Sequence, residues 1–154
     1  RWSRFNLDFR KRLSFNKSDF RISEVTILEL PEEKSDQLVS LVGKLALSKK
    51  AEKVISIDVR GLTSITDYFL ICSANTEIQV KAIADAIRNG TPDKPWRFEG
   101  YENQQWILLD YVDVIANIFK TEERNYYSLD KLWADAPTHE IVGDGKNTSD
   151  SILT

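Results

Sequence analysis

The sequence predicts a single α/β domain on a mixed five-stranded sheet, with helices mainly on one face. Two stretches carry apolar residues at helical spacing, and five shorter stretches are rich in β-branched and aromatic residues. Three of those five are apolar on both faces, which is typical of interior strands. A chain of 154 residues that is 42% apolar is long enough for one domain with a sizeable core.

Residues 1–34 are expected to form a flexible leader outside this domain. Residues 1–23 hold seven Lys or Arg and two Asp, a net charge of +5, whereas residues 24–154 have a net charge of −8. Basic residues interleaved with aromatics suit a nucleic-acid arm, and Arg-rich segments suit organellar targeting. We favour a disordered leader or a start that lies outside the natural protein.

Two helices are predicted, each with one apolar stripe. The first covers residues 36–48, with Ser35 as its N-cap. The second follows Thr76, because Thr76 and Gln79 match a capping box, and Gly90 is expected to end it.

The five predicted strands are residues 54–59, 66–72, 96–99, 105–110 and 113–119. A tight turn at Tyr111 and Val112 joins the last two. A short helical ending over 121–133 is expected to pack against the body. Residues 137–154 are rich in small polar residues and predict a disordered tail, which leaves 35–136 as the domain.

One face of the predicted sheet lacks a cover. The two helices, about 13 and 14 residues, are each roughly 20 Å long and can cover only one face. The other face, which holds Trp106 and Leu108, is therefore expected to bind a partner. Self-association is a common way to bury such a face, so we expect a homodimer in the free state.

The composition argues against several kinds of chemistry. The only histidine, His139, lies in the predicted tail, and the only cysteine, Cys72, ends an apolar strand and is expected to be a buried thiol. No phosphate-binding glycine motif occurs. We therefore predict no catalytic residue, no metal and no cofactor. The net charge of −3 does not favour sequence-specific nucleic-acid binding.

The composition also bears on location. A lone cysteine gives no disulfide framework, which indicates a reducing compartment. No apolar run approaches the roughly 18–20 residues of a membrane span. We expect a soluble, cytoplasmic protein, with a mitochondrion or chloroplast as the alternative.

Four carboxylates stand at strand ends: Asp58, Asp67, Asp110 and Asp113. Metal-binding acids of phosphoryl-transfer enzymes often occupy such places, so residual metal and nucleotide binding is one hypothesis. The favoured interpretation is that these side chains accept hydrogen bonds from turn amides.

Between about residues 35 and 133 the chain resembles the ribosomal silencing factor (RsfS/Iojap) family. The resemblance rests on Asp58, Ser-Ile-Thr-Asp-Tyr-Phe at 64–69, Gln-Val at 79–80, Ala-Ile-Ala-Asp at 82–85, Glu-Gly at 99–100, Trp-Ile-Leu-Leu-Asp at 106–110, Asp-Val at 113–114, Arg124, Tyr-Ser-Leu at 127–129 and Leu-Trp at 132–133. It departs from the family where relatives commonly have Gly and His, at Val112 and Asn117, and where Ala74 replaces a common Gly.

The resemblance implies a nucleotidyltransferase-like fold without the active site of that superfamily. It implies a non-enzymatic factor that binds the large ribosomal subunit through an L-fourteen-type ribosomal protein and sterically blocks subunit joining, which represses translation. An organellar large-subunit assembly factor is the alternative, followed by a nucleotidyltransferase-related enzyme. The implied partner-binding residues are Trp106, Leu108, Asp110, Tyr127, Leu129, Leu132 and Trp133.

Overall fold

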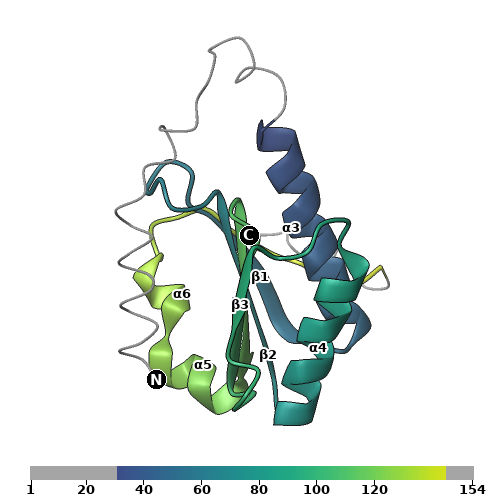
Figure 1. The fold of residues 1–154 in the computed structure, drawn as a ribbon. Coiled ribbons are helices and arrows are strands. Elements are labelled where there is room, and N and C mark those ends of the chain that lie inside the picture. Colours follow the sequence, from purple (N-terminus) through teal and green to yellow (C-terminus); the bar gives the residue numbers. More distant parts are fainter. Residues whose placement is uncertain (1–30, 145–154) are drawn as a thin grey trace.

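The computed structural model describes residues 31–144 and shows three layers (Figure 1). Helices α3 (Pro31–Ser48) and α4 (Glu77–Gly90) cover one face of the sheet, and the short helices α5 (Thr121–Tyr127) and α6 (Leu129–Leu132) lie on the other. The strands are β1 (Glu52–Asp58), β2 (Tyr68–Ala74), β3 (Arg97–Glu99), β4 (Trp106–Asp110), β5 (Val114–Lys120) and β6 (Thr138–Glu140).

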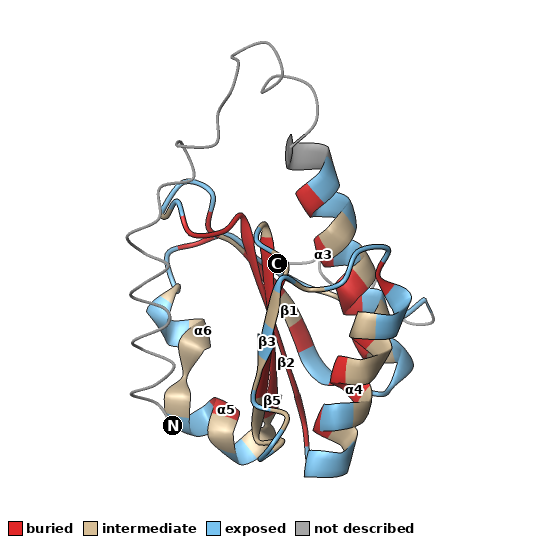
Figure 2. Cartoon of the chain, in the orientation of Figure 1, coloured by how far each residue is buried: buried red, intermediate tan, exposed pale blue. Residues whose placement is uncertain are grey.

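The sheet is mixed and has the order β3-β4-β5-β2-β1-β6. The central strands β2 and β5 are parallel, and every other neighbouring pair is antiparallel. All residues of β2 are buried, as the red central strands in Figure 2 show. The prediction that this strand is interior is confirmed.

Two apolar clusters lie on opposite faces of the sheet. The larger one packs beneath α3 and α4 and includes Val42, Ile83 and Leu109. The smaller one includes Phe69 and Phe119 and packs beneath α5 and α6. The two long helices cover one face, as predicted. The other face is not bare, because the helical ending covers much of it.

Over residues 31–144 the sheet has six strands, where the sequence predicted five. Strand β6 lies in the range predicted to be a disordered tail and pairs antiparallel with β1. Further hydrogen bonds continue this pairing on both sides, from the Asp58 N–H to the Pro137 carbonyl (2.9 Å) and from the Ile141 N–H to the Val54 carbonyl (2.8 Å). Residues 1–30 of the predicted leader and 145–154 of the predicted tail lie outside the described residues.

The capping residues predicted from the sequence are correct for one long helix and wrong for the other. Thr76 is the N-cap of α4, and its hydroxyl accepts the Gln79 N–H at 3.2 Å, as predicted. Ser35 is not an N-cap, because α3 begins at Pro31 and Ser35 lies buried within it. Proline suits a first helical turn because it lacks an N–H that would need a partner there.

Gly90 is the last residue of α4 and has no positive φ, so it does not end the helix in a left-handed conformation. An added Cβ there would collide with the Leu45 side chain of α3. Close packing of the two helices is therefore the reason for glycine at this position.

The β4–β5 turn places a β-branched residue in a strained conformation. Val112 has φ 73° and is partly exposed. The turn is held by the Asp110 carboxylate, which accepts the Val112 N–H at 2.9 Å, and by the Tyr111 N–H, which donates to the Val114 carbonyl at 2.9 Å. These bonds hold Val112 in a region that L-residues with branched side chains avoid.

We expect Val112→Gly to stabilise the protein by about 1 kcal/mol, because glycine adopts positive φ without steric cost. Urea denaturation would measure the change. Leu62→Gly is the matched control, since Leu62 is exposed and has no positive φ, and it should destabilise. Equal destabilisation by both substitutions would contradict this account of the turn.

Candidate partner-binding surface

Trp106 begins β4 and is held by contacts on several sides. Its ring stacks on Phe119 of the neighbouring strand at a centroid distance of 4.6 Å, and the Tyr127 ring of α5 lies 5.0 Å away. The indole Nε1–H donates to the Asn117 side-chain oxygen at 3.1 Å. The Trp106 side chain is only half-buried, so part of it lies at the surface.

Arg124 attaches the short helices to the sheet. Its guanidinium donates to the Lys53 carbonyl at 2.8 Å and to the Ser73 hydroxyl at 3.1 Å, and it pairs with Asp130 of α6 at 2.9 Å. A bulge in β1 makes the first bond possible, since Lys53 has φ 47° beside a register shift. One buried side chain thus connects β1, β2, α5 and α6.

The seven residues implied as partner-binding differ in how accessible they are. Leu108 and Asp110 are buried, so their side chains support the fold rather than offer contact area. Trp106, Tyr127, Leu129 and Trp133 are half-buried, and all four pack against the smaller apolar cluster. Leu132 is 66% exposed. The assignment of this set to a partner stays a prediction.

The structure adds Tyr126, which is 80% exposed and whose ring meets that of Tyr127 edge-on at 5.0 Å. The sequence offered a signal that was not used: neighbouring residues on a helix point about 100° apart, so two adjacent tyrosines cannot both face the core. We use "aromatic surface" for Trp106, Tyr126, Tyr127, Leu132 and Trp133.

The carboxylates of Asp58 and Asp110 accept hydrogen bonds from backbone amides of the turns that follow them. Asp58 accepts the Arg60 backbone N–H at 3.1 Å and pairs with its guanidinium at 2.7 Å. This hydrogen bond from the Arg60 side chain is the main cause that lowers the pKa of Asp58. Asp110 accepts the Val112 amide. The turn-capping interpretation is confirmed for Asp58 and Asp110.

The described residues hold no candidate metal centre. Within residues 31–144, no three His, Cys, Asp or Glu side chains lie close enough to hold a metal ion. Cys72 is buried, as predicted, and burial raises the pKa of its thiol to about 12. Over the same residues no helix is long and apolar enough to cross a membrane.

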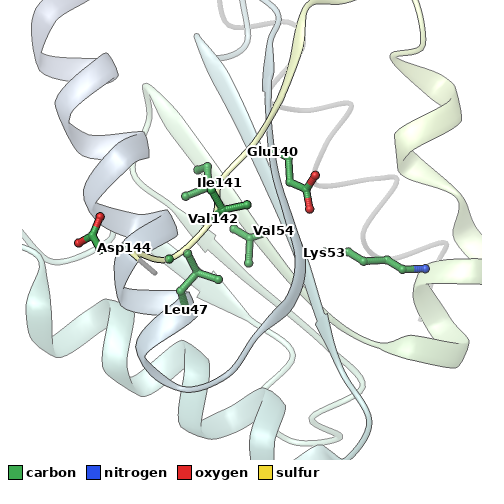
Figure 3. Close-up of a pocket in the computed structure, with 8 residues that line it drawn as sticks. Leu47, Lys53, Val54, Glu140, Ile141, Val142 and Asp144 are labelled. Carbon is green, nitrogen blue, oxygen red and sulfur yellow. The ribbon is translucent and has the colours of Figure 1, made fainter. Parts of the chain in front are cut away.

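A hollow of about 590 Å³ lies where the chain leaves β6 (Figure 3). Leu47, Val54 and Ile141 line it with apolar side chains, while Lys53 points away from Leu47. Its lining combines aliphatic groups with dispersed charges and brings no nucleophile next to a base.

The fold and the aromatic surface together define the structural class of this protein. This is a mixed α/β domain whose small second layer presents aromatic and aliphatic side chains, the residue types enriched in the centres of protein–protein interfaces. The class is that of a mixed α/β domain with an aromatic surface on its second layer.

The chain belongs to the family described as "Ribosomal silencing factor during starvation", whose model matches residues 32–152. It is 41% identical over 112 residues to the ribosomal silencing factor of Halalkalibacterium halodurans, covering 71% of this chain and 96% of that protein. It is also 27% identical over 119 residues to the chloroplastic protein Iojap of Zea mays, covering 73% of this chain and 52% of that protein.

A crystal structure of a Bacillus halodurans protein supports the same fold. It matches with a TM-score of 0.59 and 39% sequence identity, over 68% of this chain and 98% of the other. The resemblance noted in the sequence is therefore confirmed as family membership.

We expect Arg124→Ala to destabilise the protein by about 2–3 kcal/mol, because it leaves the Lys53 carbonyl and the Ser73 hydroxyl without this donor. Chemical denaturation would measure the loss, and hydrogen exchange should show the largest increase over residues 121–133. Lys131→Ala, an exposed change on α6, should alter stability by no more than about 0.5 kcal/mol. Equal effects of the two substitutions would show that Arg124 does not hold the helices.

Proposed function

We propose that this protein binds the large ribosomal subunit through an L-fourteen-type ribosomal protein and sterically blocks joining of the small subunit, which represses translation. The observation that carries the proposal is the aromatic surface on a chain of the silencing-factor family. Tyr126 and Leu132 protrude from it, and the half-buried rings behind them are packed in place. Such a surface binds without a large ordering cost.

Charge supports a basic partner. Residues 24–154 carry a net charge of −8, and Glu122 and Asp135 are exposed on the segment that carries most of the aromatic surface. Ribosomal proteins that contact RNA are rich in Lys and Arg, and an acidic surface attracts a basic one over several ångströms. The charged residues would orient the encounter, and the aromatic and aliphatic side chains would supply the binding free energy.

In this proposal the protein works as a binding factor in the cytoplasm, without catalytic residues, metal or cofactor. The Asp58–Arg60 pair and the Asp110–Val112 bond support it, because they commit these carboxylates to local structure. The nucleotidyltransferase-like description of the fold belongs to the same proposal. The Iojap relatives favour the alternative of an organellar large-subunit assembly factor acting through the same surface.

The surface can be tested at its two most exposed side chains. Tyr126→Ala and Leu132→Ala should each weaken binding to purified large subunits about fivefold or more, with thermal stability almost unchanged. Ile78→Ala is the matched control, because Ile78 is 81% exposed but lies on α4, beyond the opposite face of the sheet. Binding affinity from biolayer interferometry would decide. Loss of affinity in Ile78→Ala but not in the other two would place the binding surface on α4.

We also propose that the free protein is a homodimer. The helical ending covers more of the second face than the sequence predicted, which leaves less apolar area there for self-association. Other exposed apolar side chains lie at the sheet edge: Phe98 on the edge strand β3 and Trp96 just before it. Light scattering at tens of micromolar should give twice the monomer mass, and Trp96→Ser should lower it. A monomer mass for the unaltered chain at that concentration would contradict the proposal.

A further inference from the structure

Asn117 is a polar side chain in an apolar environment. It lies on β5 with 1% of its surface exposed, between Ile115 and Phe119, whose side chains belong to the smaller apolar cluster. Residues at alternate positions of a strand share a face, so the amide of Asn117 points into that cluster. Burying an amide is unfavourable unless its polar atoms are hydrogen-bonded. The partner that the Asn117 oxygen has there is the Trp106 indole.

The hydrogen bonds of Asn117 are unequal. Its Oδ1 accepts the Trp106 Nε1–H at 3.1 Å, whereas its Nδ2 reaches the Ile115 carbonyl only at 3.5 Å. The β4–β5 register places Leu108 directly opposite Asn117, which makes Trp106 its diagonal neighbour, within reach of a long side chain. The stronger bond is thus the one that crosses between strands.

The ring contacts of Trp106 fix the plane of the indole, but they do not fix the direction in which its N–H group points. The Phe119 ring lies 4.6 Å away at an interplanar angle of 30°, and the Tyr127 ring lies 5.0 Å away at 41°. A half-turn of the indole about its second side-chain torsion keeps a similar plane but moves the N–H to a different place. The hydrogen bond to Asn117 distinguishes the two orientations, because the second moves the indole N–H away from the Asn117 oxygen.

We propose that Asn117 is a positioning residue: it selects the indole orientation in which Trp106 presents its exposed edge to the partner. This inference rests on the proposed function, in which Trp106 belongs to the binding surface. An anchor side chain held in one rotamer before binding loses less conformational freedom on association. Asn117 itself stays buried behind the surface, so it acts through Trp106 and not by touching the partner.

The orientation can be tested in the free protein. In proton–nitrogen NMR spectra, the Trp106 indole N–H should exchange with water at least about tenfold more slowly than that of Trp96, which is 70% exposed and serves as the internal control. Equal exchange rates for the two indoles would show that the hydrogen bond does not persist in solution, and would overturn the inference.

A double-mutant cycle tests the consequence for binding. Asn117→Leu keeps the volume and removes the acceptor, and it should weaken binding to large subunits about tenfold, mainly through faster dissociation. In a Trp106→Phe background, which has no indole N–H, the same substitution should change binding less than about twofold. Equal losses in both backgrounds would mean that Asn117 only supports packing, and would overturn the inference.

A conservative variant completes the design. Asn117→His at pH 8 offers a neutral imidazole nitrogen as acceptor and should bind within about threefold of the unaltered chain. If Asn117→Leu does not fold, this variant and the indole exchange rates still decide: a folded Asn117→His that binds more than about threefold more weakly than the unaltered chain contradicts the inference. Failure of the unaltered chain to bind large subunits would refute the proposed function instead, while the NMR result would continue to report on the orientation.

Discussion

The structure depends on covering a sheet that is apolar on both faces. Helices α3 and α4 cover only one of them, which leaves Phe69, Ile71 and Phe119 to be covered by the short segment after β5. Helices as short as α5 and α6 are not stable alone, so their position must come from tertiary contacts. Arg124 supplies polar contacts to β1, β2 and α6, and the aromatic rings supply the packing.

The same constraint explains why the proposed binding surface is also part of the core. Trp106, Tyr127 and Trp133 each contact a core aromatic or belong to the layer that covers it. Truncating such a ring therefore disturbs folding and binding together. Side chains at the outer limit of the layer, Tyr126 and Leu132, separate the two effects because they carry little of the packing.

The sequence predicted the helices and strands better than it predicted the tertiary contacts between them. The period-2 and period-3.6 patterns located both long helices and the strands β1, β2, β4 and β5, because these elements carry their own apolar faces. The short strand β3 was also located, although none of its residues is buried. Strand β6 has three exposed residues and no such pattern, so its pairing with β1 depends on tertiary structure. Likewise, no local signal shows that Gly90 packs against Leu45, or that Arg124 bonds to a bulged carbonyl 71 residues away. Leu108 was assigned to the partner surface because the cover over its face was underestimated.

The proposed function requires that this protein, once bound to the large subunit, excludes the small one. Purified large subunits, preincubated with the protein and then mixed with small subunits, can be resolved by sucrose-gradient sedimentation. We expect the protein to sediment with large subunits, and joined ribosomes to disappear as its amount approaches that of the large subunit, without any nucleotide. Normal joining by large subunits saturated with the protein would refute steric exclusion, as would full inhibition by a small fraction of the equimolar amount.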